Sequence, residues 1–117
     1  MTTISKEQTL TTLINVFEVE PKNQQKLIDI LVKATEETMS KFPGFISANI
    51  HRSLDGTRVV NYAQWRRRED LENAVQSPEA QPHIQETYRI IKRVEPYLYE
   101  VAFVDEAQSH FKTKGFK

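Results

Sequence analysis

The sequence contains no cysteine, which excludes disulfides, thiolate nucleophiles, iron–sulfur clusters and cysteine-ligated zinc. Its three glycines, Gly44, Gly56 and Gly115, are too scattered for a dinucleotide- or phosphate-binding loop. Neither sign of charge prevails, because sixteen Lys and Arg residues balance sixteen Asp and Glu residues. This balance argues against a nucleic-acid-binding protein. No apolar run approaches the roughly 18 residues of a transmembrane helix, so the sequence predicts no membrane span.

The composition is that of an ordinary globular chain, with 38% apolar and 27% charged residues among 117. We expect one domain over residues 1–105 and a polar C-terminal tail over residues 106–117. The first six residues contain no apolar signal segment, so the sequence predicts a cytoplasmic protein.

The predicted elements alternate in a recognisable order. Four stretches rich in apolar and β-branched residues predict strands, namely residues 10–19, 45–53, 58–65 and 97–104. Apolar residues three and four apart predict a helix from Asn23 to Phe42, ended by Pro43 and Gly44. A second helical region is predicted over residues 68–76 and 84–94, interrupted by two prolines. The order β-α-β-β-α-β predicts an α+β ferredoxin-like sandwich, with both helical regions on one face of an antiparallel sheet.

Two predicted strands carry apolar residues on both sides. In the fourth strand one side holds Tyr97, Tyr99, Val101 and Phe103, and the other holds Leu98, Ala102 and Val104. In the first strand one side holds Leu13, Phe17 and Val19, and the other side holds Ile14 and Val16. A sheet face in water alternates apolar with polar residues, so the second face must be covered too. We therefore expect a homodimer joined through its sheet faces.

The hairpin signal Asp55-Gly56 fixes which residues face each other on the two strands that it joins. One face then holds Ile46, Ala48, Ile50, Val59, Asn61, Ala63 and Trp65. An amide and an indole N–H, at Asn61 and Trp65, converge there on space left by two alanines, which is the composition of a small-molecule pocket. The pattern alone also fits a packed core in which the Asn61 amide bonds to backbone.

Other polar residues carry weaker signals. His83 and Glu86 are one helical turn apart, but two ligands make no metal site, and a solvated helix face explains them. His51 is predicted on the opposite sheet face and His110 in the tail. The basic run at residues 66–68 is diluted by acidic neighbours and is typical of a solvated helix start.

Three short motifs are more distinctive: residues 43–48 (PGFISA), 55–57 (DGT) and 59–65 (VVNYAQW). With them the chain resembles, over residues 13–105, the antibiotic biosynthesis monooxygenase family, and within it the cofactor-independent anthrone oxygenases. The resemblance implies a ferredoxin-like fold, a dimeric α/β barrel and a pocket between helices and sheet. It also implies oxidation of a small phenolic, anthrone-like substrate to a quinone by O2, with no flavin, metal or nicotinamide.

The resemblance assigns candidate site residues. The family's strand Asn and Trp fall on Asn61 and Trp65, the candidate catalytic residues. The candidate substrate-binding residues are Ile46, Ile50, Ala63, Leu71, His83 and Tyr88. The chain departs from the family at Leu71, where those oxygenases have a pocket Tyr, and near Ile84, where they have an Arg. Tyr88 or Arg89 are the neighbouring residues that can replace that Arg.

Two alternatives remain open. A related group on the same fold degrades haem with an Asn, a Trp and an iron-ligating His, and Asn15, Trp65 and His83 fall at comparable places. The other alternative is a dimer of the same superfamily that binds aromatic molecules without converting them.

Overall fold

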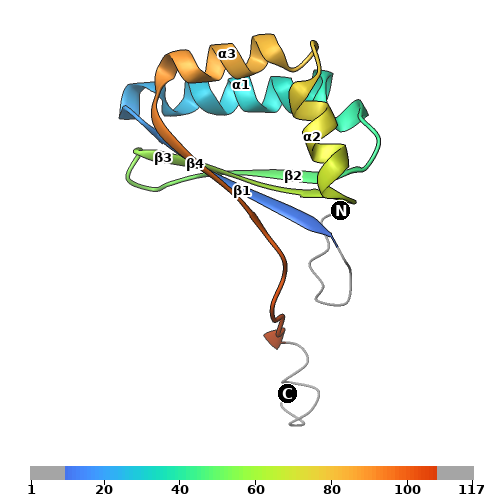
Figure 1. The fold of residues 1–117 in the computed structure, drawn as a ribbon. Helices are drawn as coiled ribbons and strands as arrows, with labels where there is room; N and C mark the ends of the chain where they lie inside the picture. The colour runs from blue at the N-terminus through green and yellow to red at the C-terminus, as the bar shows by residue number, and fades with distance from the viewer. Residues whose placement is uncertain (1–9, 108–117) are drawn as a thin grey trace.

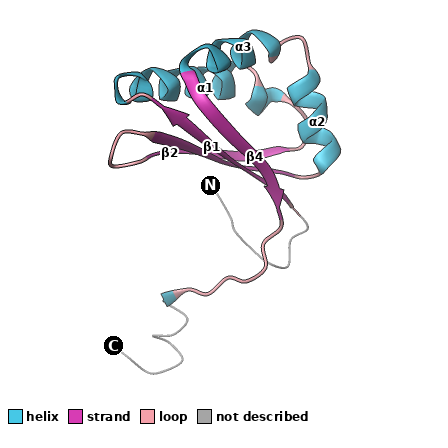
Figure 2. Ribbon diagram, turned by 60° about the vertical axis from the view of Figure 1, so that its left-hand side comes forward, coloured by secondary structure: helices cyan, strands magenta, loops and turns pink. Residues whose placement is uncertain are grey.

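Four antiparallel strands form one sheet in the order β2-β3-β1-β4, and the helices lie together on one face of it (Figures 1 and 2). The computed structural model describes residues 10–107. The strands are β1 (Thr11–Val19), β2 (Phe45–Arg52), β3 (Arg58–Trp65) and β4 (Ile91–Tyr99). The helices are α1 (Gln24–Glu37), α2 (Arg68–Gln76) and α3 (Gln81–Ile90), with short 3-10 helices η1 (Pro21–Asn23) and η2 (Met39–Lys41). The predicted α+β ferredoxin-like fold is confirmed.

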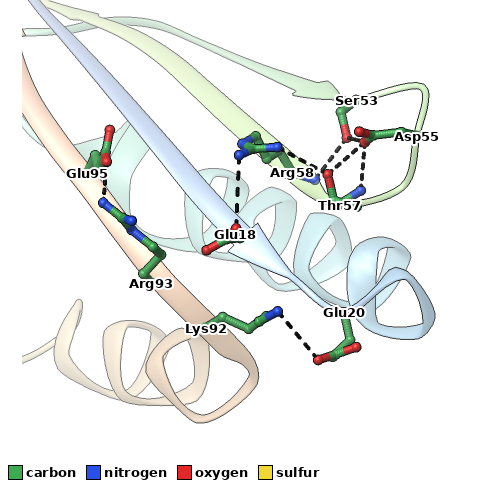
Figure 3. Close-up of polar contacts among 9 residues, drawn as sticks. All are labelled: Glu18, Glu20, Ser53, Asp55, Thr57, Arg58, Lys92, Arg93 and Glu95. Atoms are coloured by element: carbon green, nitrogen blue, oxygen red, sulfur yellow. Dashed lines mark hydrogen bonds and ion pairs between the residues drawn. The ribbon is translucent and has the colours of Figure 1, made fainter.

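The β2–β3 hairpin turns at Asp55 and Gly56, as predicted. The Asp55 carboxylate accepts hydrogen bonds from the Thr57 hydroxyl (2.7 Å), the Thr57 N–H (3.0 Å) and the Ser53 hydroxyl (2.8 Å) (Figure 3). These bonds, led by the one from the Thr57 side chain, lower the pKa of Asp55 from 3.8 to about 2. The hydrogen bonds to the ionised Asp55 therefore stabilise the turn fully at pH values above the ordinary carboxyl pKa. This stabilisation is lost as the pH falls through about 2.

The register that this turn sets is confirmed except at its far end. Ile50 faces Asn61 and Ala48 faces Ala63, as predicted, but an irregularity between Phe45 and Ser47 shifts the last pair. Phe45, not Ile46, lies opposite Trp65, and the two rings meet edge to face with centroids 5.4 Å apart. The predicted Ile46–Trp65 pair is therefore wrong. A bulge adds one residue to a strand, so the side chains beyond it point to the opposite face of the sheet from the one expected.

The fourth strand begins earlier than predicted. The helix expected to reach Val94 ends at Ile90, and β4 runs from Ile91 to Tyr99 rather than over residues 97–104. Pro96 lies within the strand, opposite Asn15. An edge strand pairs on one side only, so it tolerates a residue without an N–H. Residues 101–104 consequently follow the strand instead of forming it, and their predicted two-sided pattern is wrong.

The first helix ends sooner than its apolar stripe predicted. It closes at Glu37, where the backbone N–H of Thr38 donates to the carbonyl of Ala34 (3.1 Å). Thr38 has non-helical dihedral angles, and η2 continues the chain toward β2. Thr38 thus occupies a helix end rather than a helix interior, and its buried side chain is directed toward α3.

Gly44 allows the start of β2 to lie against α2. Its φ of +87° falls in the left-handed region, and a Cβ there would lie 2.2 Å from an Asp70 carboxylate oxygen. The Gly44 carbonyl also accepts the backbone N–H of Arg66 (2.7 Å), just before α2. This close approach holds α2 over the end of β3, where Trp65 lies.

The core divides into two clusters. One joins α1 to the sheet through Phe17, Val19, Leu27, Leu31 and Val59, and the other joins α2 to it through Ala63, Trp65, Leu71 and Ala74. No helix within residues 10–107 has the length and apolar character needed to cross a bilayer. His51 is exposed on the sheet face away from the helices, as predicted, whereas His110 and most of the predicted tail lie outside the described residues.

Candidate active site

A cavity of about 430 Å³ lies between the sheet and the helices. All four strands and all three helices contribute to its wall. Four alanines, Ala34, Ala48, Ala63 and Ala80, line it where larger side chains would fill it. Protein interiors normally leave few voids larger than a water molecule, and ligand pockets measure roughly 300–1,000 Å³. The pocket predicted beside Asn61 and Trp65 therefore exists in the structure.

Two asparagines from neighbouring strands form the polar part of the cavity floor. Asn15 of β1 and Asn61 of β3 are directly opposed in the sheet, and both line the cavity. Such pairs have Cβ atoms about 4.5–5.5 Å apart. Both Oδ1 atoms are buried and have no hydrogen-bond partner within the described part of the chain. A buried acceptor without a donor costs about 1–3 kcal/mol, so this pair is suited to receive donors from a ligand.

Trp65 closes one end of the cavity. Its side chain is only 2% exposed, and the edge-to-face contact with Phe45 fixes its ring. Phe45 also lines the cavity. Because a rigid indole presents its N–H in one direction, Trp65 is suited to donate a hydrogen bond to a bound molecule.

The helices add polar side chains to the opposite wall. These are Thr35 from α1, Glu72 and Gln76 from α2, and His83, Thr87 and Tyr88 from α3. Glu72 accepts from the Arg68 Nε at 2.9 Å, and Tyr88 is 59% exposed, so both lie toward solvent. Within residues 10–107 no group of three or more His, Asp or Glu residues could hold a metal ion.

His83 lies at the cavity, where the resemblance placed it as a candidate substrate-binding residue, and not on a solvated helix face. It is half-buried and lines the cavity, and its Nε2 lies 3.1 Å from the hydroxyl of Thr38. Its carbonyl accepts the Thr87 hydroxyl at 2.9 Å. The prediction of a solvated helix face is wrong at this position, because the end of α1 packs against α3.

The structure brings most of the predicted site residues to one cavity. Asn61, Trp65, Ala63, Leu71, His83 and Tyr88 all line it. Ile46 does not line the cavity, because the bulge in β2 places Phe45 at that position instead. Ile50 shares the face but packs against the Phe17–Val59 core instead. Ile84 lines the cavity where the family's Arg was expected, and Arg89 does not line it.

Asn15 is the polar residue that the anthrone-oxygenase interpretation of the sequence missed. The sequence signal for Asn15 was an amide on the same side of the first strand as the apolar Leu13 and Phe17. Only the pairing of β1 with β3 reveals that it faces Asn61. No short turn joins these strands, so their register could not be read from local sequence.

Comparison with known proteins identifies the family. The family model described as antibiotic biosynthesis monooxygenase matches residues 11–86. The chain belongs to this family. A tetracenomycin-F1 monooxygenase of Streptomyces glaucescens is 46% identical over 101 residues, which cover 86% of this chain and 89% of that protein. These matches place the chain among the monooxygenases, as the resemblance implied.

Solved structures of the family share the fold. A monooxygenase from the gene ActVA-Orf6 of Streptomyces coelicolor, in complex with nanaomycin D, is 25% identical with a TM-score of 0.71, covering 82% of this chain and 90% of that one. SnoaB, a cofactor-independent oxygenase from Streptomyces nogalater, has a TM-score of 0.69 at 20% identity, covering 81% of this chain and 95% of that one. At that identity the SnoaB match concerns the fold alone.

Proposed function

We propose that this protein is a cofactor-independent monooxygenase that oxidises a small phenolic, anthrone-like polycyclic molecule to a quinone with O2. The cavity that holds Asn15, Asn61 and Trp65 beneath the helices carries the proposal, because it joins an apolar space to amide and indole groups. The relatives support the substrate class, since one is named for tetracenomycin F1 and another was solved with nanaomycin D.

The proposed chemistry needs no cofactor because the substrate supplies the electrons. Triplet O2 reacts slowly with ordinary closed-shell molecules, which is why flavins or metals are commonly recruited. A phenolic anthrone that has lost a proton is electron-rich enough to pass an electron to O2 directly. Overall the ring methylene and O2 become a carbonyl and water, so one oxygen atom enters the product. The protein must exclude water, orient the rings and stabilise the anionic oxygen.

The two asparagines suit both states of such a substrate. A carboxamide offers an acceptor and a donor without changing its own charge. Before proton loss, the substrate hydroxyls donate to the buried Oδ1 atoms of Asn15 and Asn61. After it, the Asn61 amide and the Trp65 indole N–H donate to the oxygen that carries the negative charge. Catalysis depends on donors that are in place before the charge develops.

Haem degradation is the second candidate, and one observation favours it. Asn15, Trp65 and His83, the residues of the haem alternative, line the same cavity. However, Nε2 of His83 is within hydrogen-bond distance of Thr38, so one of its two nitrogens is engaged. In this alternative the free nitrogen would ligate iron, and added haem would show a Soret band that His83→Ala abolishes.

The test of the proposed function is oxygen uptake with dithranol, a dihydroxyanthrone. Protein treated with a chelator and then dialysed should accelerate uptake well above the spontaneous rate, with the quinone as product. Isotopically labelled O2 should leave one labelled oxygen atom in the quinone. Binding without acceleration would instead support the non-catalytic dimer, and a Soret band on haem addition would support haem degradation.

A homodimer joined through the sheet faces is part of the proposal. The face away from the helices bears apolar and aromatic side chains in adjacent rows, namely Ile14, Val16, Val60, Tyr62, Tyr97 and Tyr99. Charged pairs lie at one end of this face, including Glu18–Arg58 and Arg93–Glu95 (Figure 3). Beyond β4 the chain runs away from the sheet (Figure 1). Phe103 in this segment is 76% exposed. An apolar centre with a charged border is typical of a protein interface.

The dimer prediction is tested by sedimentation velocity. The wild type should sediment at twice the chain mass of 13.7 kDa, and Ile14→Glu should shift it to the monomer by placing a charge in the interface. Val32→Glu, at an exposed position of α1, is the matched control and should leave the dimer intact. A wild type that sediments as a monomer at micromolar concentration would contradict the proposal. The cytoplasmic location remains a prediction.

A further inference from the structure

The proposed reaction begins with the loss of a proton, so the cavity must contain a group that accepts one. Asn, Gln, Thr and Trp side chains are not bases at neutral pH. Among the described residues that line the cavity, only Glu72, His83 and Tyr88 have titratable side chains. The Glu72 carboxylate is paired with Arg68 at 2.9 Å, and its side chain is half exposed. Tyr88 is largely exposed, and a neutral phenol is a poor proton acceptor. His83 is the remaining candidate.

One hydrogen-bond partner engages the ring of His83 and another engages its backbone. The Thr38 hydroxyl, buried at the end of α1, lies 3.1 Å from Nε2. One helical turn later on α3, the Thr87 hydroxyl donates to the His83 carbonyl at 2.9 Å. When Nε2–H donates to Thr38, Nδ1 is the acceptor of the neutral ring. A second group that fixes the tautomer and orientation of a base is typical of acid–base catalysis.

The charged and titratable groups around His83 come from α1, η2, α2 and α3, and those of α3 include the exposed Glu86 one turn after His83. Glu37 and Lys41 line the surface hollow beside Thr38, together with Glu79, which precedes α3. Across the cavity Glu72 of α2 is neutralised by Arg68, and Tyr88 lies on α3 itself. The described strands contribute no charged side chain to the cavity. An imidazolium formed at His83 therefore faces no unpaired cation within the cavity.

We propose that His83 is the general base that removes the proton from the hydroxyl of the substrate's enol form, in which that oxygen is conjugated with the ring carbon that O2 oxidises, a role that rests on the proposed function. The substrate O–H bond breaks, the proton bonds to Nδ1, and the electron pair stays on the substrate oxygen. No electron is transferred in this step, and O2 reacts with the resulting anion afterwards. Asn61 and Trp65 then stabilise the anion from the sheet, while the His83 imidazolium balances its charge from α3.

The experiment separates proton transfer from oxidation by excluding oxygen. Dithranol is mixed with the protein under anaerobic conditions. Binding is measured by quenching of the fluorescence of Trp65, the chain's single tryptophan. Ionisation is measured by the red-shifted absorption of the dithranol anion. The wild type should show both signals. His83→Gln should retain quenching but show no more anion than dithranol in buffer, and its aerobic turnover should fall about 10²–10⁴-fold. Glu69→Gln, at an exposed titratable position of α2 outside the cavity, is the matched control and should behave as the wild type.

A second variant keeps the test decisive if His83→Gln folds poorly. His83→Ala should lose the anion signal, and imidazole added to the buffer should restore it, which a purely structural role would not produce. Full ionisation in either variant without imidazole would overturn the role of His83 while leaving the proposed function intact. If wild-type protein fails to bind dithranol at all, the proposed function falls, and the role of His83 falls with it.

Discussion

Replacing Asn61 by leucine is expected to lower kcat/KM for dithranol oxidation by about 10²–10³-fold, the effect of losing one preorganised donor to an oxyanion. Leucine nearly matches the shape of asparagine, so the cavity keeps its volume while the amide is lost. Because Oδ1 of Asn61 has no hydrogen-bond partner among the described residues, the substitution breaks no hydrogen bond at that atom, and the variant should fold normally. Steady-state oxygen uptake measures the rate, and quenching of Trp65 fluorescence measures binding.

Two further variants make this result specific. Asn73→Leu, at an exposed position of α2 outside the cavity, is the matched control and should leave kcat/KM unchanged. Asn15→Leu should also lower activity, and the double variant with Asn61→Leu should lose less than the product of the single losses, because opposed residues act on one substrate. Wild-type kcat/KM in Asn61→Leu would remove this residue from the proposed mechanism.

The part of the site that the sequence predicted is the part that a short turn controls. Two turn residues, Asp55 and Gly56, set the pairing of β2 with β3, so Asn61 and Ala63 were assigned to the correct face. The same reasoning failed at Ile46, since a bulge leaves no sequence signal as plain as that of a turn. The assignment of catalytic roles to Asn61 and Trp65 remains a prediction until variants are measured.

What the sequence could not predict depends on contacts between distant segments. The pairing of Asn15 with Asn61 requires β1 and β3 to meet across a long connection, and no local pattern reports it. The contact of His83 with Thr38 could not be predicted, because the position of Thr38 depends on where α1 ends. The fourth strand was predicted to begin only after Pro96, at residue 97, but an edge strand accepts this proline in its interior. Each error concerns tertiary packing rather than local propensity.

Replacing Trp65 by phenylalanine is expected to lower kcat/KM by about 10²-fold, at the lower end of the loss for one oxyanion donor. Phenylalanine keeps an aromatic ring against Phe45 but removes the indole N–H. Trp65→Ala would instead empty a buried site and cost about 3–5 kcal/mol of unfolding free energy, so it cannot separate chemistry from packing. Urea denaturation distinguishes the two variants, and oxygen uptake measures the first.

The outcome for Trp65→Phe decides what the indole contributes. A loss in kcat with unchanged KM indicates a hydrogen bond made only in the transition state, as expected for a donor to an anionic oxygen. A rise in KM with unchanged kcat would instead indicate that Trp65 only shapes the cavity, and the donor role would then fall to Asn61 alone. Because the edge-to-face contact with Phe45 holds the ring in one orientation, Phe45→Leu should produce a weaker form of the same kcat loss. An indole that catalyses through its N–H must be held still, and this neighbouring ring holds it.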